Sequence, residues 1–132
     1  MIEKFTEKLA ILLQGNIPEE IDTAKITGEG ELNLANMLNQ LITFMQEIHD
    51  FIVPLSKGEL AEIKMSRKNF FGSPFKELHS RLLHLTWQAN QVANGDFSQR
   101  VDFMGDFSEA INNMVVSLDK NEKILKEKID EL

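Results

Sequence analysis

The sequence predicts an all-α fold in which helices alternate with long connectors as tandem helix-connector-helix units. Two observations lead to this prediction. Apolar residues recur with alternating steps of three and four in four separate stretches, which is the spacing of an apolar stripe along one face of a helix. The segments between these stretches have no helical period and carry glycines and prolines, the residues that most often interrupt helices.

The first two helices are predicted on either side of a connector that contains Pro18, Gly28 and Gly30. The first helix runs from about residue 2 to 14 and is ended by Gly15. Its apolar stripe is Ile2, Phe5, Leu9 and Leu12. The second helix begins near Glu31, and Pro54 lies late in it, where a proline kinks or ends a helix. Its stripe is Leu34, Leu38, Leu41, Met45, Ile48, Ile52 and Leu55.

The last two helices are predicted on either side of a connector at residues 96–106. Ser73 and Pro74 make a good helix start, a capping residue followed by proline in the first turn. This helix runs to about Asn94, and its stripe is Phe75, Leu78, Leu82, Leu85, Ala89 and Val92. The last helix runs from Phe107 to the end of the sequence, where a charged tail typical of a coiled coil has no cap, so we expect the native chain to continue. Its stripe is Ile111, Leu118, Leu125 and Leu132.

An internal repeat links these elements. Gly15, Gly58 and Gly95 each follow a helix, and the positions three, six, ten and thirteen residues before each glycine are all apolar. An eight-residue helical phrase follows each connector, starting at Leu34 (LANMLNQL), Phe75 (FKELHSRL) and Phe107 (FSEAINNM). The sequence thus predicts three copies of one unit, in which each middle helix closes one unit and opens the next.

The connectors are long enough to let neighbouring helices run parallel. About 12 to 18 extended residues reach roughly 40 Å or more, whereas a 15-residue helix is about 22 Å long. Such a connector can return along the bundle, while a short loop enforces antiparallel neighbours.

Composition excludes several classes of function. The 132 residues carry a net charge of −7 without a Lys/Arg cluster, so we expect no nucleic-acid partner and no anionic membrane surface. No cysteine is present, which excludes a disulfide framework and a zinc-thiolate site and suits a cytoplasmic protein. The N-terminus does not read as a signal peptide, and the longest apolar run, Leu9 to Leu13, is too short to insert into a membrane.

The third unit resembles the HAMP domain of bacterial signalling proteins. Residues 102–107 (DFMGDF) align without a gap on the family's Asp-Glu-apolar-Gly-x-Leu phrase, and residues 110–114 (AINNM) align on its Ala-Phe-Asn-x-Met. Pro74 matches the proline that opens the family's first helix. Phe103 stands where the family carries a glutamate associated with switching. The match covers residues 31 to 118 well, and the whole chain resembles a tandem HAMP array.

The resemblance implies three HAMP-like units: residues 1–56, residues 34–93, which share helices with both neighbours, and residues 74–132, which include the coiled-coil tail. It also implies a parallel homodimeric four-helix bundle. Such a module has no catalytic function and no cofactor. It relays a conformational change from a sensory input to an output domain in the same longer chain, of the histidine kinase or diguanylate cyclase type. The relay residues expected in the core are Leu82, Leu85, Ala89, Val92, Gly95, Val101, Met104, Gly105, Phe107, Ile111 and Met114.

Two other functions are weighed against this interpretation. His49, followed by an acid and by Pro54-Leu55, has the spacing of a histidine-kinase phosphoacceptor box, so one alternative is a phosphotransfer or kinase-dimerisation bundle. Another is a helical sensor in which Trp87 and phenylalanines line a pocket for a small ligand. His79 and His84 lie on different helix faces, so no metal site is expected. No residue set supports catalysis, and an enzyme is not predicted.

Overall fold

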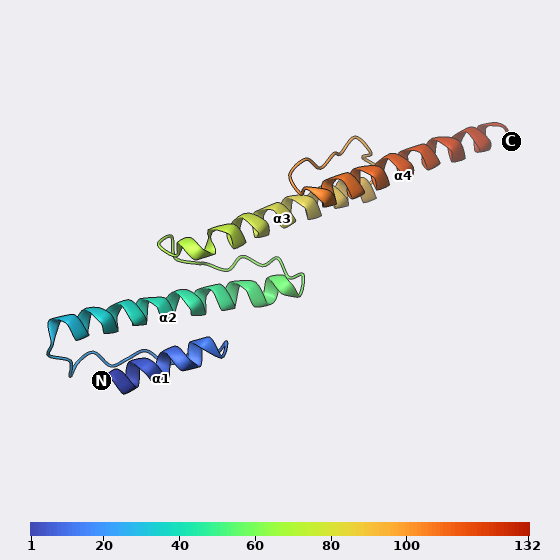
Figure 1. Ribbon diagram of the computed structural model, residues 1–132. Helices are drawn as coiled ribbons and strands as arrows, with labels where there is room; N and C mark the ends of the chain where they lie inside the picture. The colour runs from blue at the N-terminus through green and yellow to red at the C-terminus, as the bar shows by residue number, and fades with distance from the viewer. The chain divides into compact units, whose positions relative to one another are not determined.

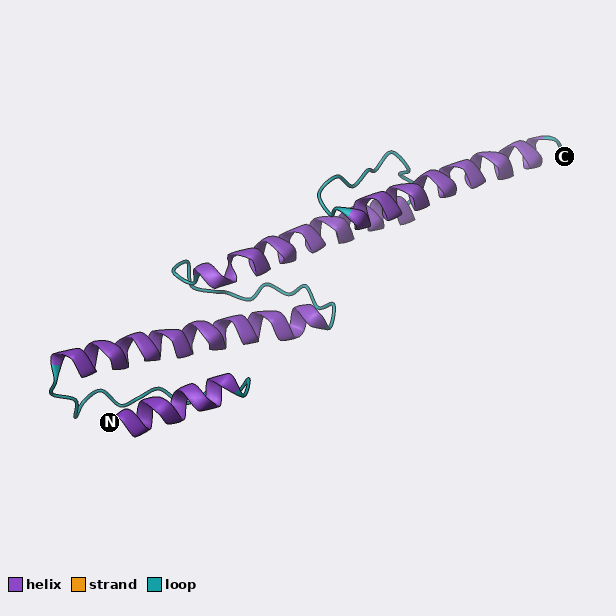
Figure 2. Ribbon diagram, viewed as in Figure 1, coloured by secondary structure: helices purple, strands orange, loops and turns teal.

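The computed structural model describes all 132 residues and contains no β-strand (Figure 2). Helices make up 67% of the chain. The helices are α1 (Ile2–Leu13), α2 (Glu29–Ser56), α3 (Ser73–Ala93) and α4 (Asp106–Asp130), with a short 3-10 helix at Phe70–Gly72 before α3. The all-α prediction is confirmed, and the four predicted helices begin and end within about two residues of the observed ones, which is the usual uncertainty of a helix end.

The chain divides into two compact units, Met1–Phe75 and Lys76–Leu132, and each is described by itself. The division lies inside α3, three residues after it begins. The middle HAMP-like unit predicted at residues 34–93 therefore has residues in both. None of the four helices is long and apolar enough to cross a membrane.

In the first unit, α1 and α2 run in the same direction because the connector between them returns along α1 (Figure 1). The core of this unit joins all three segments. It contains Phe5 of α1, Ile21 and Ile26 of the connector, and Ala35, Leu38 and Ile42 of α2. Burying these apolar side chains is the main force that holds the short α1 in place, since a helix of 12 residues is marginal in water by itself.

The second connector packs along α2 within the same unit. Glu47 of α2 accepts a hydrogen bond from the backbone N–H of Ser66 (2.9 Å), and the buried Asn69 donates to the carbonyl oxygen of Phe44 (3.0 Å). Met65 packs so closely on Gly72 that a Cβ there would lie 1.8 Å from the Met65 sulfur. This connector is thus tied to α2 by polar contacts as well as apolar ones.

The second unit consists of most of α3, the connector at residues 94–105, and α4. This connector also turns back, so α3 and α4 run in the same direction (Figure 1). Val92 of α3, Val101 of the connector and Val115 of α4 are buried and form the core. Beyond Val115, α4 continues to Asp130 with its side chains largely exposed.

The three predicted helix stops share one geometry. Gly15, Gly58 and Gly95 all have positive φ, between 79° and 97°, a conformation that glycine adopts without steric cost. At Gly95, for example, the backbone N–H donates to the carbonyl of Val92 (2.9 Å), and the next N–H, of Asp96, donates to Gln91 (3.0 Å). This is the Schellman pattern, and the same pair of hydrogen bonds follows α1 and α2.

Candidate functional site

An asparagine of α4 fastens the third connector to that helix. The side-chain oxygen of Asn112 accepts a hydrogen bond from the backbone N–H of Val101 (2.7 Å), and its side-chain nitrogen donates to the Val101 carbonyl (2.8 Å). Both backbone groups of a buried connector residue are therefore satisfied by one side chain, in a segment that has no secondary structure to satisfy them.

The first unit contains the same contact. Asn39 of α2 accepts from the N–H of Ile21 (2.7 Å) and donates to its carbonyl (2.9 Å). Ile21 and Val101 also correspond in sequence, since each is the sixth residue after a helix-ending glycine. We call these two contacts the asparagine clamps. They hold the deepest apolar residue of a connector against the helix that follows it.

Neither asparagine was among the predicted relay residues, although Asn112 lies in the phrase AINNM (residues 110–114) that carries the family resemblance. The signal was nevertheless present, because Asn39 and Asn112 both occupy the sixth position of the repeated eight-residue phrase. The phrase that begins at Phe75 has Ser80 at this position, and a serine hydroxyl lacks the paired acceptor and donor groups of an amide. The clamp therefore distinguishes the first and third copies of the repeat from the middle copy.

Burial along α2 and α4 follows the same pattern around the clamps. Ile42 and Val115, each three residues after its asparagine, are buried, whereas Leu41 and Met114, two residues after it, are exposed. In each helix, one side of the apolar stripe packs inside the unit and the other side remains open to solvent.

In the second unit, the open side forms a groove of about 380 Å³ between α3 and α4. Its lining is mostly apolar and includes six of the eleven predicted relay residues. These six are Leu85, Ala89, Val92, Val101, Ile111 and Met114. The other five, Leu82, Gly95, Met104, Gly105 and Phe107, lie outside the groove lining.

The third connector is held from the α3 side by Gln88. This side chain is buried, and its Nε2 donates to the carbonyl of Arg100 (2.8 Å). Asn112 holds the adjacent Val101 from the α4 side. Arg100 and Val101 follow one another in the connector, and the first is hydrogen-bonded to α3 and the second to α4. The connector therefore sets the distance between the two helices that form the walls of the groove.

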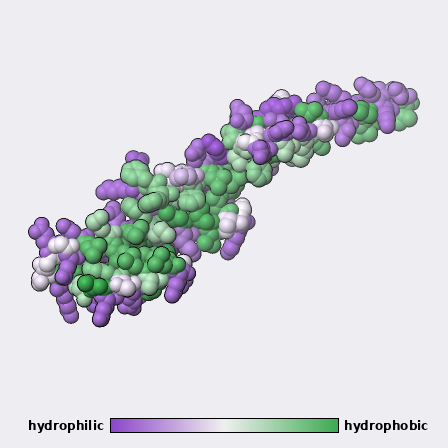
Figure 3. All heavy atoms as spheres, viewed as in Figure 1, coloured by the Kyte–Doolittle hydropathy of each residue, from purple (hydrophilic) through white to green (hydrophobic).

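A second groove, of about 280 Å³, lies in the first unit between the end of α1 and the second half of α2. Its apolar walls include Leu12, Ile17, Met45 and Ile52. His49 lies at this groove with its side chain more than half exposed, and its Nδ1 is 3.6 Å from a carboxylate oxygen of Asp50. Figure 3 shows hydrophobic residues gathered over the exposed face of α1 and α2.

Aromatic residues meet on the second unit. The ring of His84 stacks on that of Trp87, with ring centroids 6.0 Å apart, and lies 5.0 Å from the ring of Phe103. Phe103 thus contacts α3 through a ring. Trp87 itself is half exposed and does not line either groove. No cluster of three or more histidine, aspartate or glutamate side chains is arranged to hold a metal ion.

The start of the third connector is shaped by Asp96. Its carboxylate accepts hydrogen bonds from the Ser98 hydroxyl, the Gln99 amide and the Ser98 backbone N–H. These bonds favour the ionised carboxylate and lower the pKa of Asp96. Because the pKa is lower in the folded state, the ionised group stabilises this turn at neutral pH, and the contribution is lost as the pH falls through the folded pKa.

We expect Ser98→Ala to raise the pKa of Asp96, because it removes the hydrogen bond with the largest effect. An NMR titration of the Asp96 side-chain carbonyl carbon measures this directly. Ser117→Ala, at an exposed serine of α4, is the matched control and should leave the titration unchanged. An unchanged Asp96 titration in Ser98→Ala would show that the Ser98 hydroxyl does not bond to Asp96 in solution.

Comparison with known proteins gives no match: no family model fits the chain, and neither a curated protein nor a solved structure is significantly similar to it.

Proposed function

We propose that this chain is a signal-relay module built from HAMP-like units and that it works as a parallel homodimer. The observation that carries the proposal is the groove between α3 and α4, which is lined by six of the predicted relay residues and lies open to solvent. Parallel α1/α2 and α3/α4 pairs, each with a returning connector and an asparagine clamp, add support from the repeat itself.

Two parallel helices cannot bury an apolar stripe on each helix without further partners. In each unit, the connector covers one side of the stripe and leaves the other in water. Met114 is 52% exposed, while its neighbour Val115 is only 1% exposed. A second copy placed with its own open stripe against this one completes a four-helix core, and burial of the additional apolar area stabilises the dimer.

The proposed relay is a change in helix packing. The first and third connectors are each fastened to the following helix by a clamp, so a displacement of the helix before the connector is transmitted through the connector as well as across the groove. Two packings of the dimer that differ by about a few kcal/mol are enough for an input to shift the population between them. No bond is made or broken in this process, and no cofactor takes part.

The proposed place of the module in a signalling protein is the one that the resemblance to HAMP domains implies. The module lies in the cytoplasm and receives its input from a sensory element. Its output is a domain of the same longer chain, such as a histidine kinase or diguanylate cyclase. The HAMP-like units thus connect two functions that they do not themselves perform.

Cross-linking tests the parallel dimer with little interference, because the chain has no cysteine of its own. Leu85→Cys places the only thiol in the groove. We expect it to form a disulfide between two copies under mild oxidation, since equivalent residues meet across the axis of a parallel dimer. Leu83→Cys, two residues away and thus on the opposite side of α3, should not cross-link.

Light scattering on the unmodified chain gives the independent measurement. A particle of about twice 15.1 kDa supports the proposal. A monomer at all concentrations, together with equal and weak cross-linking at both cysteine positions, would contradict it.

A further inference from the structure

The second connector presents two adjacent phenylalanines to solvent just before α3. Phe70 and Phe71 are 79% and 69% exposed, and they begin the short 3-10 helix that forms the small loop before α3 in Figure 1. They line neither of the two grooves. Single exposed apolar residues are common on proteins, whereas adjacent large ones that remain exposed indicate a site of interaction. The pair therefore needs a partner that the chain itself does not supply.

The loop is folded so that its inner side is already filled. The N–H of Asn69 donates to the carbonyl of Ser66 (3.1 Å), and the N–H of Gly72 donates to that of Asn69 (3.0 Å), so two tight turns follow one another. Asn69 and Gly72, the last residues of the two turns, are buried. The Asn69 side chain donates to the carbonyl of Phe44 in α2 (3.0 Å), and Gly72 packs closely on Met65. Because these contacts fill the inner side of the loop, the two rings stay outside.

Each turn exposes its two middle residues. These are Arg67 and Lys68 in the first turn and Phe70 and Phe71 in the second. Neither basic side chain forms an ion pair, and residues 63–75 contain no aspartate or glutamate. Two cations without a counter-ion thus stand beside two exposed rings.

We call residues 66–72 the basic-aromatic tip. Its charge is opposite to that of the whole chain, whose net charge of −7 predicts no anionic membrane surface as a partner. Net charge is an average, however, and in physiological salt a charge acts over only about 8 Å. The tip is therefore attracted to an anionic surface although the chain is acidic overall.

We propose that the basic-aromatic tip docks on an anionic membrane surface. Phe70 and Phe71 insert between lipid headgroups, where their apolar area leaves water, and Arg67 and Lys68 bind the negatively charged groups around them. A protruding ring suits a lipid surface, because lipids move apart to admit it, whereas a protein partner must supply a fitting pocket. The tip is already ordered by its contacts with α2, so docking costs little conformational entropy.

Docking by the tip does not require the homodimer, because the whole tip lies in the first unit of one chain. Since Asn69 ties the tip to α2, docking holds this helix close to the lipid surface. A monomer and a dimer would both bind. A failure to bind vesicles therefore leaves the homodimer untouched, and a monomer found by light scattering leaves the docking untouched.

Co-sedimentation with lipid vesicles tests this docking. We expect the chain to bind phosphatidylcholine vesicles that contain about one-third phosphatidylserine, and to bind vesicles of phosphatidylcholine alone about tenfold more weakly. Phe70→Ala should lower the partition coefficient on the mixed vesicles by about tenfold, because a ring that would leave water is missing. Phe107→Ala is the matched control: it removes a ring that is 66% exposed but lies next to Asp106 in α4, and it should leave the coefficient unchanged.

The basic residues are tested separately. The double variant Arg67→Gln/Lys68→Gln should bind the mixed vesicles about tenfold or more weakly and bind phosphatidylcholine vesicles as before. The double variant Lys120→Gln/Lys128→Gln removes the same charge from exposed positions of α4 and should have no effect. Equal losses for the tip variants and their controls would overturn the proposal. So would the absence of the unmodified chain from both vesicle pellets, in which case an acidic protein surface is the partner left for the tip.

Discussion

Met114→Lys is expected to dissociate the dimer, raising its dissociation constant by about 100-fold or more. Met114 lines the groove and is half exposed in the single chain. In the proposed dimer it is covered, so each copy would bury an unpaired ammonium group, at a cost on the order of 3 kcal/mol. The helical content of the monomer should not change, because the new side chain extends into solvent when no partner is present. Light scattering measures the dissociation, and circular dichroism measures the helical content.

Asn113→Lys is the control for this substitution. It introduces the same charge one residue earlier, at an exposed position on the side of α4 opposite Ile111. We expect it to leave the dimer intact. Equal dissociation by both variants would mean that general charge, and not the groove, controls association. A dimer unaffected by Met114→Lys would show that the groove is not the interface.

Asn112→Ala is expected to release the third connector from α4 and to lower the free energy of unfolding by about 2 to 4 kcal/mol. The substitution leaves the N–H and carbonyl of the buried Val101 without partners, and each unpaired buried group costs about 1–3 kcal/mol. Urea denaturation measures the loss of stability. Hydrogen exchange of the Val101 amide, which should become much faster, locates the loss at the connector.

Two comparisons make this result specific. Asn113→Ala removes the neighbouring exposed amide and should change neither measurement. Asn39→Ala should repeat the effect in the first unit, at the amide of Ile21. Unchanged protection of Val101 in Asn112→Ala would show that apolar packing alone holds the connector and that the clamp contributes little.

The region around the clamps shows that sequence periodicity does not predict which side of an apolar helix face is buried. Periodicity located the apolar stripe of α2 at Leu34, Leu38 and Leu41, and the structure instead buries Ala35, Leu38 and Ile42. Both sets belong to one broad apolar face. Which side of that face a single chain covers depends on the path of the connector, and that path is fixed by Ile21, Asn39 and the apolar contacts around them.

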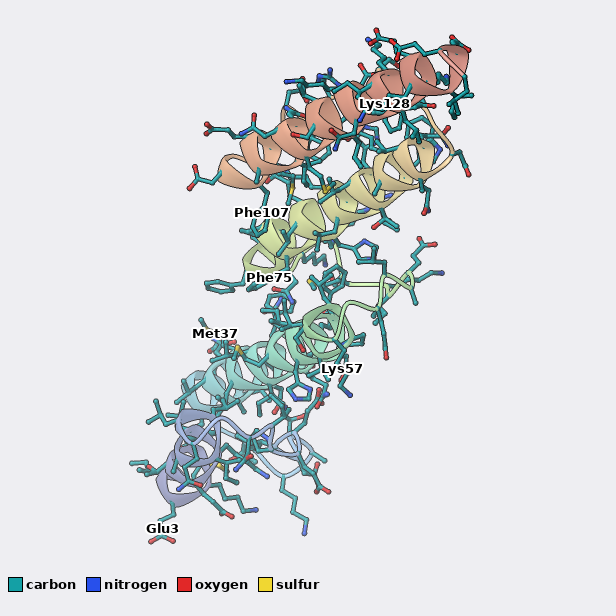
Figure 4. The ribbon with its side chains drawn as sticks, turned by 90° about the vertical axis from the view of Figure 1, so that its right-hand side faces the viewer. Glu3, Met37, Lys57, Phe75, Phe107 and Lys128 are labelled. Carbon is teal, nitrogen blue, oxygen red and sulfur yellow. The ribbon has the colours of Figure 1, made fainter.

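Figure 4 shows the consequence at Met37, which lies on the side of α2 away from α1 and is well exposed. Similarly, the tie between Glu47 and the second connector involves residues 19 apart in sequence, and no local pattern predicts it. Polar contacts of this kind depend on two segments arriving at one place with suitable geometry. The two asparagines were visible in the repeat, but their partners were not.

The sequence by itself determined the all-α class, the bounds of four helices, and the glycine stops with positive φ. These are local properties, set by side-chain periodicity and by the conformations that single residues allow. Only the tertiary structure decided which apolar residues are buried within one chain, which line an open groove, and which backbone groups the asparagines hold. Those outcomes depend on the connectors, whose course is set by contacts between residues that are distant in sequence.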